Sequence, residues 1–285
     1  YRSSRGLGDV YKRQGLLRAK ILRVKFREEV IKNMNPDNLR SVQDRKLFDQ
    51  LMADQAVMDV NQQIQRREKE GPLGTRRRLL STAVKLSRTM SPHLTTIAEN
   101  CIEKLEVDLP VELYVYNSPQ FNAACVKPEE GKLFIMFSSS LLDAFDQQEL
   151  LFVMGHELGH FIYQHHSIPV GYLLSGQSPI EPELALKLSS WSRYAEFSAD
   201  RAGAFCVDNL EAVGRSLFKL ASGVSGSMVS FDLQDFLQQV DEMKIEDESA
   251  DSRSSMQDWF LTHPFSPLRV KACLLYTSPS PRDDR

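Results

Sequence analysis

Gly-His-Glu-Leu-Gly-His, residues 155–160, is the stretch that decides the fold of this chain. It follows a strongly apolar run, and Asp-Gln-Gln-Glu at 146–149 in front of that run predicts the start of a helix. Residues four apart share one face of a helix, so the side chains of His156 and His160 can reach one ion. Neutral imidazole nitrogens are ligands of zinc, and Glu157 would lie beside an open coordination position. The stretch therefore predicts a buried helix that carries a zinc site.

A catalytic zinc ion takes three protein ligands and keeps one position open, so a third ligand must lie elsewhere in the chain. Glu196 and Asp200 are four residues apart on a helix predicted over residues 184–207. Two carboxylates on one helix face destabilise the helix unless a cation offsets them. Zinc on Glu196, with Asp200 holding a histidine ligand, would supply that cation. The alternative is that Arg193 and Arg201 neutralise an exposed face; the upstream histidine pair favours the ligand hypothesis.

His166 is a second candidate for the third ligand, because it follows His156 by ten residues, the spacing of the metzincin proteases. The metzincin motif needs a glycine where the chain turns out of the helix, and Tyr163 stands at that position. Without the turn, His166 is expected to leave the face that carries His156 and His160. His165 and His166 are then expected to end the helix, where cations suit the helix dipole. The metzincin arrangement stays open as the alternative.

Outside the two helices that carry these residues, the sequence pattern is typical of a mostly helical α+β fold. Runs of β-branched and aromatic residues over 111–116 and 132–137 predict two strands of one small sheet. Ser91-Pro92 predicts the start of another helix. A long polar helix is expected from Asn35-Pro36 to about Glu70. An extended peptide is expected to add to the edge formed by residues 132–137.

Both ends of the chain resemble translated sequencing adapter rather than protein. Back-translation of Ser4–Gln14 and of Cys273–Arg282 gives opposite strands of one DNA segment. A biological inverted repeat is the alternative explanation. We expect residues 1–14 and 273–285 to be adapter-derived scars, and we exclude them from the fold prediction.

The composition narrows the classes of function. The chain has 285 residues, with 35 Lys and Arg against 38 Asp and Glu, and its net charge of −3 gives no reason to expect a nucleic-acid partner. It contains no run of about 18 apolar residues, so no membrane-spanning helix is expected. Four cysteines, of which Cys273 lies in the expected scar, are too few for a disulfide scaffold and favour a reducing, cytoplasmic compartment. Cys101, Cys125 and Cys206 lie in or beside apolar stretches and are expected to be buried thiols.

Three features in this order resemble peptidase family forty-eight of the metallopeptidases. They are residues 155–160, the helix with Glu196 and Asp200, and Thr-His-Pro at 262–264 with Arg269. The family includes the HtpX-like heat-shock proteases and the CAAX prenyl proteases, and the chain looks like a soluble bacterial-type member. The resemblance implies a zincin-like fold of the gluzincin kind, with a small sheet, an active-site helix and one zinc ion per chain.

The resemblance also implies roles for individual residues. The implied zinc ligands are His156, His160 and Glu196. Glu157 matches the general base, and Asp200 matches the carboxylate behind a ligand histidine. His263 matches the histidine that stabilises the oxyanion. Asn122-Ala123 resembles the family's Asn-Ala segment beside the substrate.

The expected domain organisation places the site in the second half of the chain. Gly71-Pro-Leu-Gly74 marks the best boundary, between a helical N-terminal extension over 15–74 and a zinc metallopeptidase domain over 75–272. Within the extension, residues 16–34 alternate apolar and basic side chains. A basic amphipathic helix can lie on an anionic membrane, but a solvated helix face is favoured because the stretch is short.

The expected function is a zinc-dependent metalloendopeptidase that acts on peptides or unfolded proteins. Zinc would activate a water molecule, and Glu157 would take the proton of that water. The alternative from another class is a non-catalytic, zinc-stabilised interaction module whose N-terminal helices bind a partner. Glu157 favours catalysis, because a structural zinc site does not need that carboxylate. Contact with a membrane surface is not favoured.

Overall fold

The computed structural model describes residues 36–71, 74–174, 181–239, 242, 269–270 and 273. Residues 39–285 cluster as one compact unit, and residues 1–38 form another. The expected scar at 1–14 and the basic helix over 16–34 lie outside the described residues. Of the expected scar at 273–285, only Cys273 is described, and it is buried.

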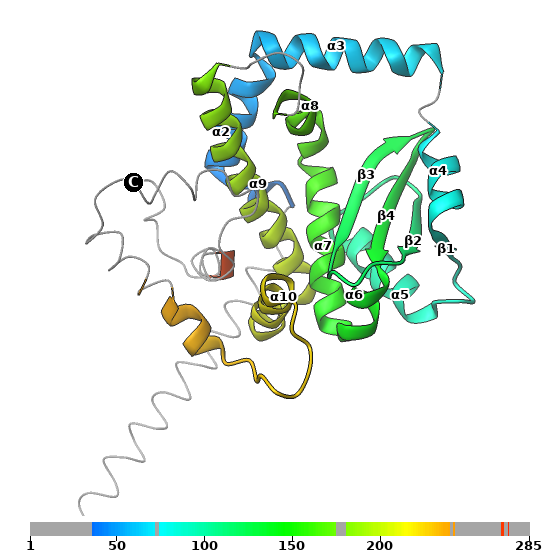
Figure 1. Ribbon diagram of the computed structural model, residues 1–285, viewed down its shortest axis with the longest axis vertical. Coiled ribbons are helices and arrows are strands. Elements are labelled where there is room, and N and C mark those ends of the chain that lie inside the picture. Colours follow the sequence, from blue (N-terminus) through cyan, green and yellow to red (C-terminus); the bar gives the residue numbers. More distant parts are fainter. Residues whose placement is uncertain are drawn as a thin grey trace, which may run out of the picture. The chain divides into compact units, whose positions relative to one another are not determined.

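The described elements are mostly helices with one small sheet, which confirms the α+β fold class (Figure 1). The helices are α2 (Val42–Met52), α3 (Gln55–Glu70), α4 (Thr75–Thr82), α5 (Pro92–Lys104), α6 (Ser139–Ala144), α7 (Gln147–Ile162), α8 (Val170–Leu174), α9 (Pro182–Val207) and α10 (Leu210–Ser222). Two short 3-10 helices are η1 (Pro36–Leu39) and η2 (His165–Ser167). The strands are β1 (Val84–Leu86), β2 (Val111–Tyr116), β3 (Ala123–Glu129) and β4 (Lys132–Ser138). None of the described helices is long and apolar enough to cross a bilayer.

The sheet has the strand order β1-β2-β4-β3. β4 pairs in parallel with β2 and antiparallel with β3, so it lies inside the sheet, with Leu133 and Ile135 fully buried. The expectation that residues 132–137 form an edge is therefore wrong, and β3 is the outer strand instead. The sequence did not indicate β3 because Lys127 and Pro128 are poor strand residues, which an edge tolerates better than an interior position.

Helix α7 begins where the sequence predicts and contacts β3 on one side. The Asp146 side chain accepts hydrogen bonds from the N–H groups of Gln148 and Glu149, each at 2.9 Å. The Glu149 carboxylate accepts from the N–H of Asp146 at 2.7 Å, which completes a capping box. Phe152 and Leu158 are among the buried apolar residues that hold the helix in the core.

Helices α7 and α9 pack against each other at close range (Figure 1). Small residues allow the approach: a Cβ added to Gly155 would lie 2.7 Å from Cys206 Sγ, and one added to Gly159 would lie 2.9 Å from Ala202 Cβ. On α9, a Cβ added to Gly203 would lie 2.6 Å from the carbonyl oxygen of Phe152. The two predicted helices of the candidate site therefore lie side by side.

Replacing Gly203 with alanine is expected to lower the free energy of unfolding by about 1–3 kcal/mol. Alanine favours a helix by up to about 1 kcal/mol, but its Cβ would collide with the Phe152 carbonyl oxygen, which the backbone of α7 holds in place. Urea unfolding measures the change. Gly171→Ala in α8 is the matched control, because an added Cβ there meets nothing within 4 Å. Equal stability of Gly203→Ala and wild type would contradict the close packing.

The N-terminal segment differs from the single long helix expected up to Glu70. Helix α2 ends at Met52, and α3 starts again after Asp54, whose side chain accepts a hydrogen bond from the N–H of Ala56 at 3.0 Å. The short Asp54 side chain competes for backbone N–H groups, which favours a new helix start over continuation. Leu51 and Val57 lie in one buried cluster with Trp191 of α9. Helix α2 therefore packs against the helix that carries Glu196.

Candidate metal centre

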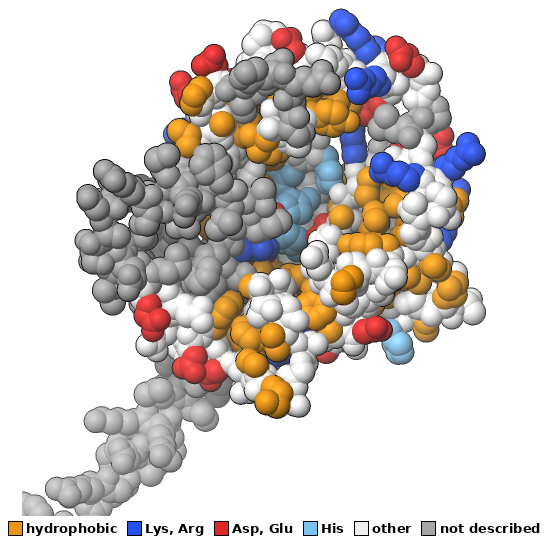
Figure 2. Space-filling view, in the orientation of Figure 1, with side chains coloured by type: hydrophobic (Ala, Val, Ile, Leu, Met, Phe, Trp, Pro, Cys, Tyr) orange, Lys and Arg blue, Asp and Glu red, His pale blue; other side chains and the backbone are white. Residues whose placement is uncertain are grey.

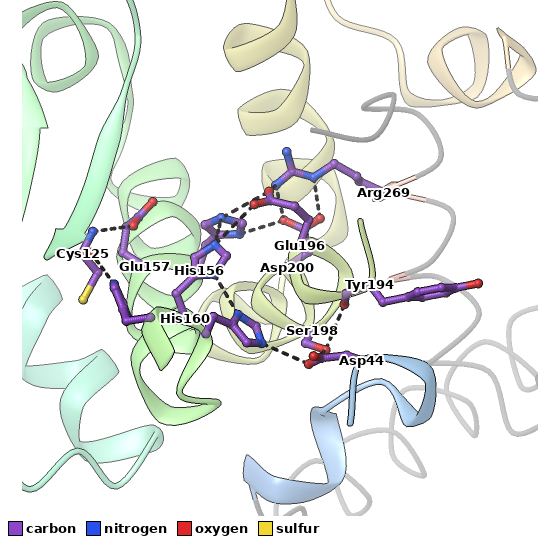
Figure 3. A network of polar contacts seen from close by, with 12 residues as sticks. Asp44, Cys125, His156, Glu157, His160, Tyr194, Glu196, Ser198, Asp200 and Arg269 are labelled. Carbon is purple, nitrogen blue, oxygen red and sulfur yellow. Dashed lines mark hydrogen bonds and ion pairs between the residues drawn. The ribbon is translucent and has the colours of Figure 1, made fainter. Parts of the chain in front are cut away.

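His156, His160 and Glu196 converge at the contact between α7 and α9 (Figure 3). The Nε2 atoms of His156 and His160 are 3.1 Å apart. Glu196 Oε1 lies 3.5 Å from His160 Nε2, and Glu196 Oε2 lies 3.7 Å from His156 Nε2. Tetrahedral bonds of zinc length place two ligand atoms about 3.3 Å apart. The three side chains therefore fit around one ion.

The chemistry of the donor set also fits a cation. Burial lowers the pKa of His160 well below its ordinary value, and the neutral imidazole is the form that binds a metal. Burial alone would lower the pKa of His156, but the surrounding carboxylates, Asp200 first, raise it. The carboxylates around His156 thus favour a positive charge beside that ring, which a divalent cation would supply while His160 stays neutral.

Asp200 contacts His156 on the Nδ1 side of its ring. Its Oδ1 atom lies 2.9 Å from His156 Nδ1, a contact that places a ring proton on Nδ1 and would leave the Nε2 lone pair of a neutral ring available to a cation. Arg269 donates two hydrogen bonds of 2.7 Å to Asp200 and lies 3.1 Å from Glu196 Oε2. Burial alone would raise the pKa of Asp200, but Arg269 and His156 hold it below its usual range. Arg269 is therefore a cation that offsets the carboxylate pair on α9.

Glu157 lies on the side of α7 that faces the sheet. Its Oε2 atom accepts a hydrogen bond from the backbone N–H of Cys125 in β3 at 2.7 Å (Figure 3). Burial raises the pKa of the Glu157 carboxyl above its ordinary value, although His156 and the Cys125 N–H oppose the shift. A carboxylate with a raised pKa beside a metal site can take and return a proton.

Two cavities reach the three converging side chains, and Glu196 lines both. The larger, about 850 Å³, is lined by His160 together with parts of α3, α8 and β3. The smaller, about 210 Å³, is lined among others by His156, Glu157, Asn122 and Ala123. Figure 2 shows histidine side chains at the bottom of a hollow bordered by hydrophobic side chains. The site is thus open to a ligand that extends to both sides of it.

A sequence profile described as Peptidase family M48 matches residues 89–276, more than half of the chain. This chain belongs to peptidase family M48. The match confirms the family that the three ordered motifs resemble. It includes both helices of the candidate metal centre and Arg269, whereas α2 and α3 lie before it.

Each relative of this M48 chain is longer than the segment of it that aligns with the chain. It is 28% identical over 215 residues to the plastoglobule-localized metallopeptidase 48 of Arabidopsis thaliana, over 67% of this chain and 59% of that protein. It is 32% identical over 98 residues to a protease HtpX homolog of Tropheryma whipplei, over 34% of this chain and 33% of that protein. It is similar to the crystal structure of S. mikatae Ste24p, with 15% identity and a TM-score of 0.41, over 63% of this chain and 49% of that one. The chain therefore spans less than two thirds of each of these proteins.

Asn122 and Ala123 lie where β3 begins. The N–H of Ser138 in β4 donates to the carbonyl of Asn122 at 2.8 Å, and the Asn122 side chain donates to the Tyr116 hydroxyl at 2.8 Å. Backbone groups alternate along an antiparallel ladder, so those of Ala123 and Cys125 point away from β4. These two residues form the outer edge of the sheet beside α7.

His166 lies apart from the three converging side chains. Helix α7 ends at Ile162, and Gln164, with φ of 59°, turns the chain into η2, which contains His165 and His166. The expectation that these two histidines end the helix is therefore wrong, because the turn comes before them. His166 Nε2 donates to the carbonyl of Cys125 at 2.6 Å. Among the described residues, the group that could hold a metal contains Glu196 and not His166.

His263, which the sequence predicts to stabilise an oxyanion, lies outside the described residues.

The structure adds residues that no motif indicated. Asp44 and His165 contact each other behind His160, although 121 residues separate them in the sequence. The backbone N–H of Cys125 contacts Glu157. Every residue except proline has such a donor, so the residue type does not reveal this contact. No spacing signal could have found these contacts.

Proposed function

We propose that this M48 chain is a zinc-dependent metalloendopeptidase whose zinc ligands are His156, His160 and Glu196. The observation that carries the proposal is the convergence of these three donors at tetrahedral distances beside Glu157, with Glu196 lining two cavities. Two histidines and one carboxylate leave one coordination position open, which is typical of catalytic rather than structural zinc.

The chain's own residues divide the work of peptide hydrolysis. When bound, zinc supplies Lewis acidity and lowers the pKa of a water molecule toward about 7. Glu157 takes the proton of the attacking water at its carboxylate and delivers it to the leaving amine. Asp200 and Arg269 keep His156 and Glu196 in place through the contacts described above. His263 stays the predicted donor to the oxyanion.

The substrate that we propose is an extended peptide or an unfolded protein. Such a strand can add to the outer edge of β3 at Ala123, where main-chain hydrogen bonds give affinity, since the outward N–H and carbonyl of Cys125 already bond to Glu157 and His166. The outward position of Ala123 beside the smaller cavity supports a substrate-binding role for Asn122 and Ala123. Space on both sides of Glu196 favours cleavage within a chain over removal of a terminal residue.

Metal removal tests the proposal. We expect the purified full chain to hold about one zinc ion and to cleave casein, to lose cleavage when 1,10-phenanthroline removes the zinc, and to regain it when zinc is added back. Zinc content is measured by mass spectrometry, and cleavage by release of soluble peptides. A chain that keeps one zinc ion but cleaves no unfolded substrate would instead be an interaction module.

A further inference from the structure

A chain of hydrogen bonds leads from His160 to a helix outside the residues that the family profile matches. His160 Nδ1 lies 2.8 Å from His165 Nδ1, and His165 Nε2 lies 3.0 Å from Asp44 Oδ2 (Figure 3). His160 is on α7, His165 is in η2, and Asp44 is on α2. The profile begins at residue 89, so Asp44 lies well before it.

The tautomers along this chain follow from the metal site. An ion on His160 Nε2 leaves the ring proton on Nδ1, which then donates to His165 Nδ1. His165 must therefore carry its own proton on Nε2, and this N–H donates to Asp44. This order of donors and acceptors is consistent at Asp44, because an ionised carboxylate can only accept hydrogen bonds.

The surroundings of Asp44 keep its carboxylate a hydrogen-bond acceptor. It is fully buried, and Arg40, Trp191 and Ser198 all donate to it in addition to His165. Burial alone would raise the pKa of Asp44, but His165 and Arg40 hold it well below its usual range. The Trp191 and Ser198 donors come from α9, which also carries Glu196. The carboxylate is therefore fixed to the same helix that supplies the third candidate ligand.

The two histidines of the site are held in matching ways. His156 Nδ1 contacts the carboxylate of Asp200 directly, and His160 reaches the carboxylate of Asp44 through His165. Partners of this kind fix the tautomer and ring orientation of a metal-bound histidine. An unsupported His160 ring would be free to rotate about χ2 and turn Nε2 away from the ion.

We propose that Asp44 is a positioning residue of the metal centre, which fixes the orientation of His160 through His165 and makes α2 part of the site. This inference rests on the proposed function, because it takes His160 as a zinc ligand. A merely structural Asp44 would affect the stability of the metal-free protein and leave the zinc affinity of the folded protein unchanged. A positioning Asp44 affects zinc affinity itself.

The test measures the zinc Kd of the folded full chain by competition with a chromophoric chelator. Asp44→Asn and His165→Gln are each expected to raise the Kd about 10–100-fold, the usual cost of losing such a partner. The double variant is expected to bind zinc no more weakly than the weaker-binding single variant, because both changes break the same chain of hydrogen bonds. The absorption bands of bound Co²⁺ should shift in all three variants, as a sign of altered ligand geometry.

Glu149→Gln is the matched control. Glu149 is a fully buried carboxylate on α7 that contacts Arg215 and Lys219, away from the chain of histidines. We expect this variant to lower the unfolding free energy without changing the zinc Kd or the Co²⁺ spectrum. An equal loss of affinity in Glu149→Gln, or unchanged affinity in both Asp44→Asn and His165→Gln, would overturn the inference. An unchanged zinc Kd in His160→Ala would instead overturn the proposed function.

Discussion

Replacing Glu157 with glutamine is expected to lower kcat/KM for casein cleavage by about 10²–10⁴-fold while zinc stays bound. The side-chain oxygen of glutamine can still accept the hydrogen bond from the Cys125 N–H. The amide cannot take a proton from water, so only the proton-transfer step is lost. Zinc stays because Glu157 is not one of the three converging donors. Zinc content and initial rates, measured on the same preparation, separate the two effects.

Glu99→Gln is the matched control for this result, because Glu99 is an exposed glutamate that pairs with Arg88 on the surface of α5. It makes the same chemical change far from the cavities and is expected to leave both cleavage and zinc content unchanged. Cleavage by Glu157→Gln at the wild-type rate would rule out Glu157 as the general base. Loss of zinc from Glu157→Gln would show that the carboxylate supports the metal rather than the proton transfer.

The sequence predicts those parts of the site whose partners lie within about one helical turn. His156 and His160 share a face because they are four residues apart, and the same holds for Glu196 and Asp200. The cap at Asp146 also acts over three residues, so it sets the start of α7 locally. These contacts depend on helix geometry alone, and helix geometry can be read from spacing.

The remaining parts depend on how distant segments pack. Asp44 meets His165 across 121 residues, and Arg269 meets Asp200 across 69. Many acids and arginines in the chain could have satisfied these groups, so residue type alone does not select the partner. The outer position of β3 likewise depends on which strand follows which in the sheet, and strand order is a tertiary property.

Replacing Glu196 with alanine is expected to raise the zinc Kd about 10²–10⁴-fold, because a binding free energy of about 10–16 kcal/mol is shared among three or four ligands. Casein cleavage should fall with the zinc content. His166→Ala is the comparison that decides between the two candidate third ligands. It removes a hydrogen bond to the carbonyl of Cys125 but leaves the three converging donors intact, so it is expected to keep its zinc.

Two measurements keep this comparison decisive. Urea unfolding of the metal-free variants shows whether either change acts through stability, since Glu196 also contacts Arg269. Zinc titration of the folded variants then ranks the ligands directly. Loss of zinc from His166→Ala with retention in Glu196→Ala would establish the metzincin arrangement, and the turn at Gln164 would have to reopen to bring His166 to the ion. The opposite ranking places the third ligand on α9, where the close contact at Gly203 brings it against α7.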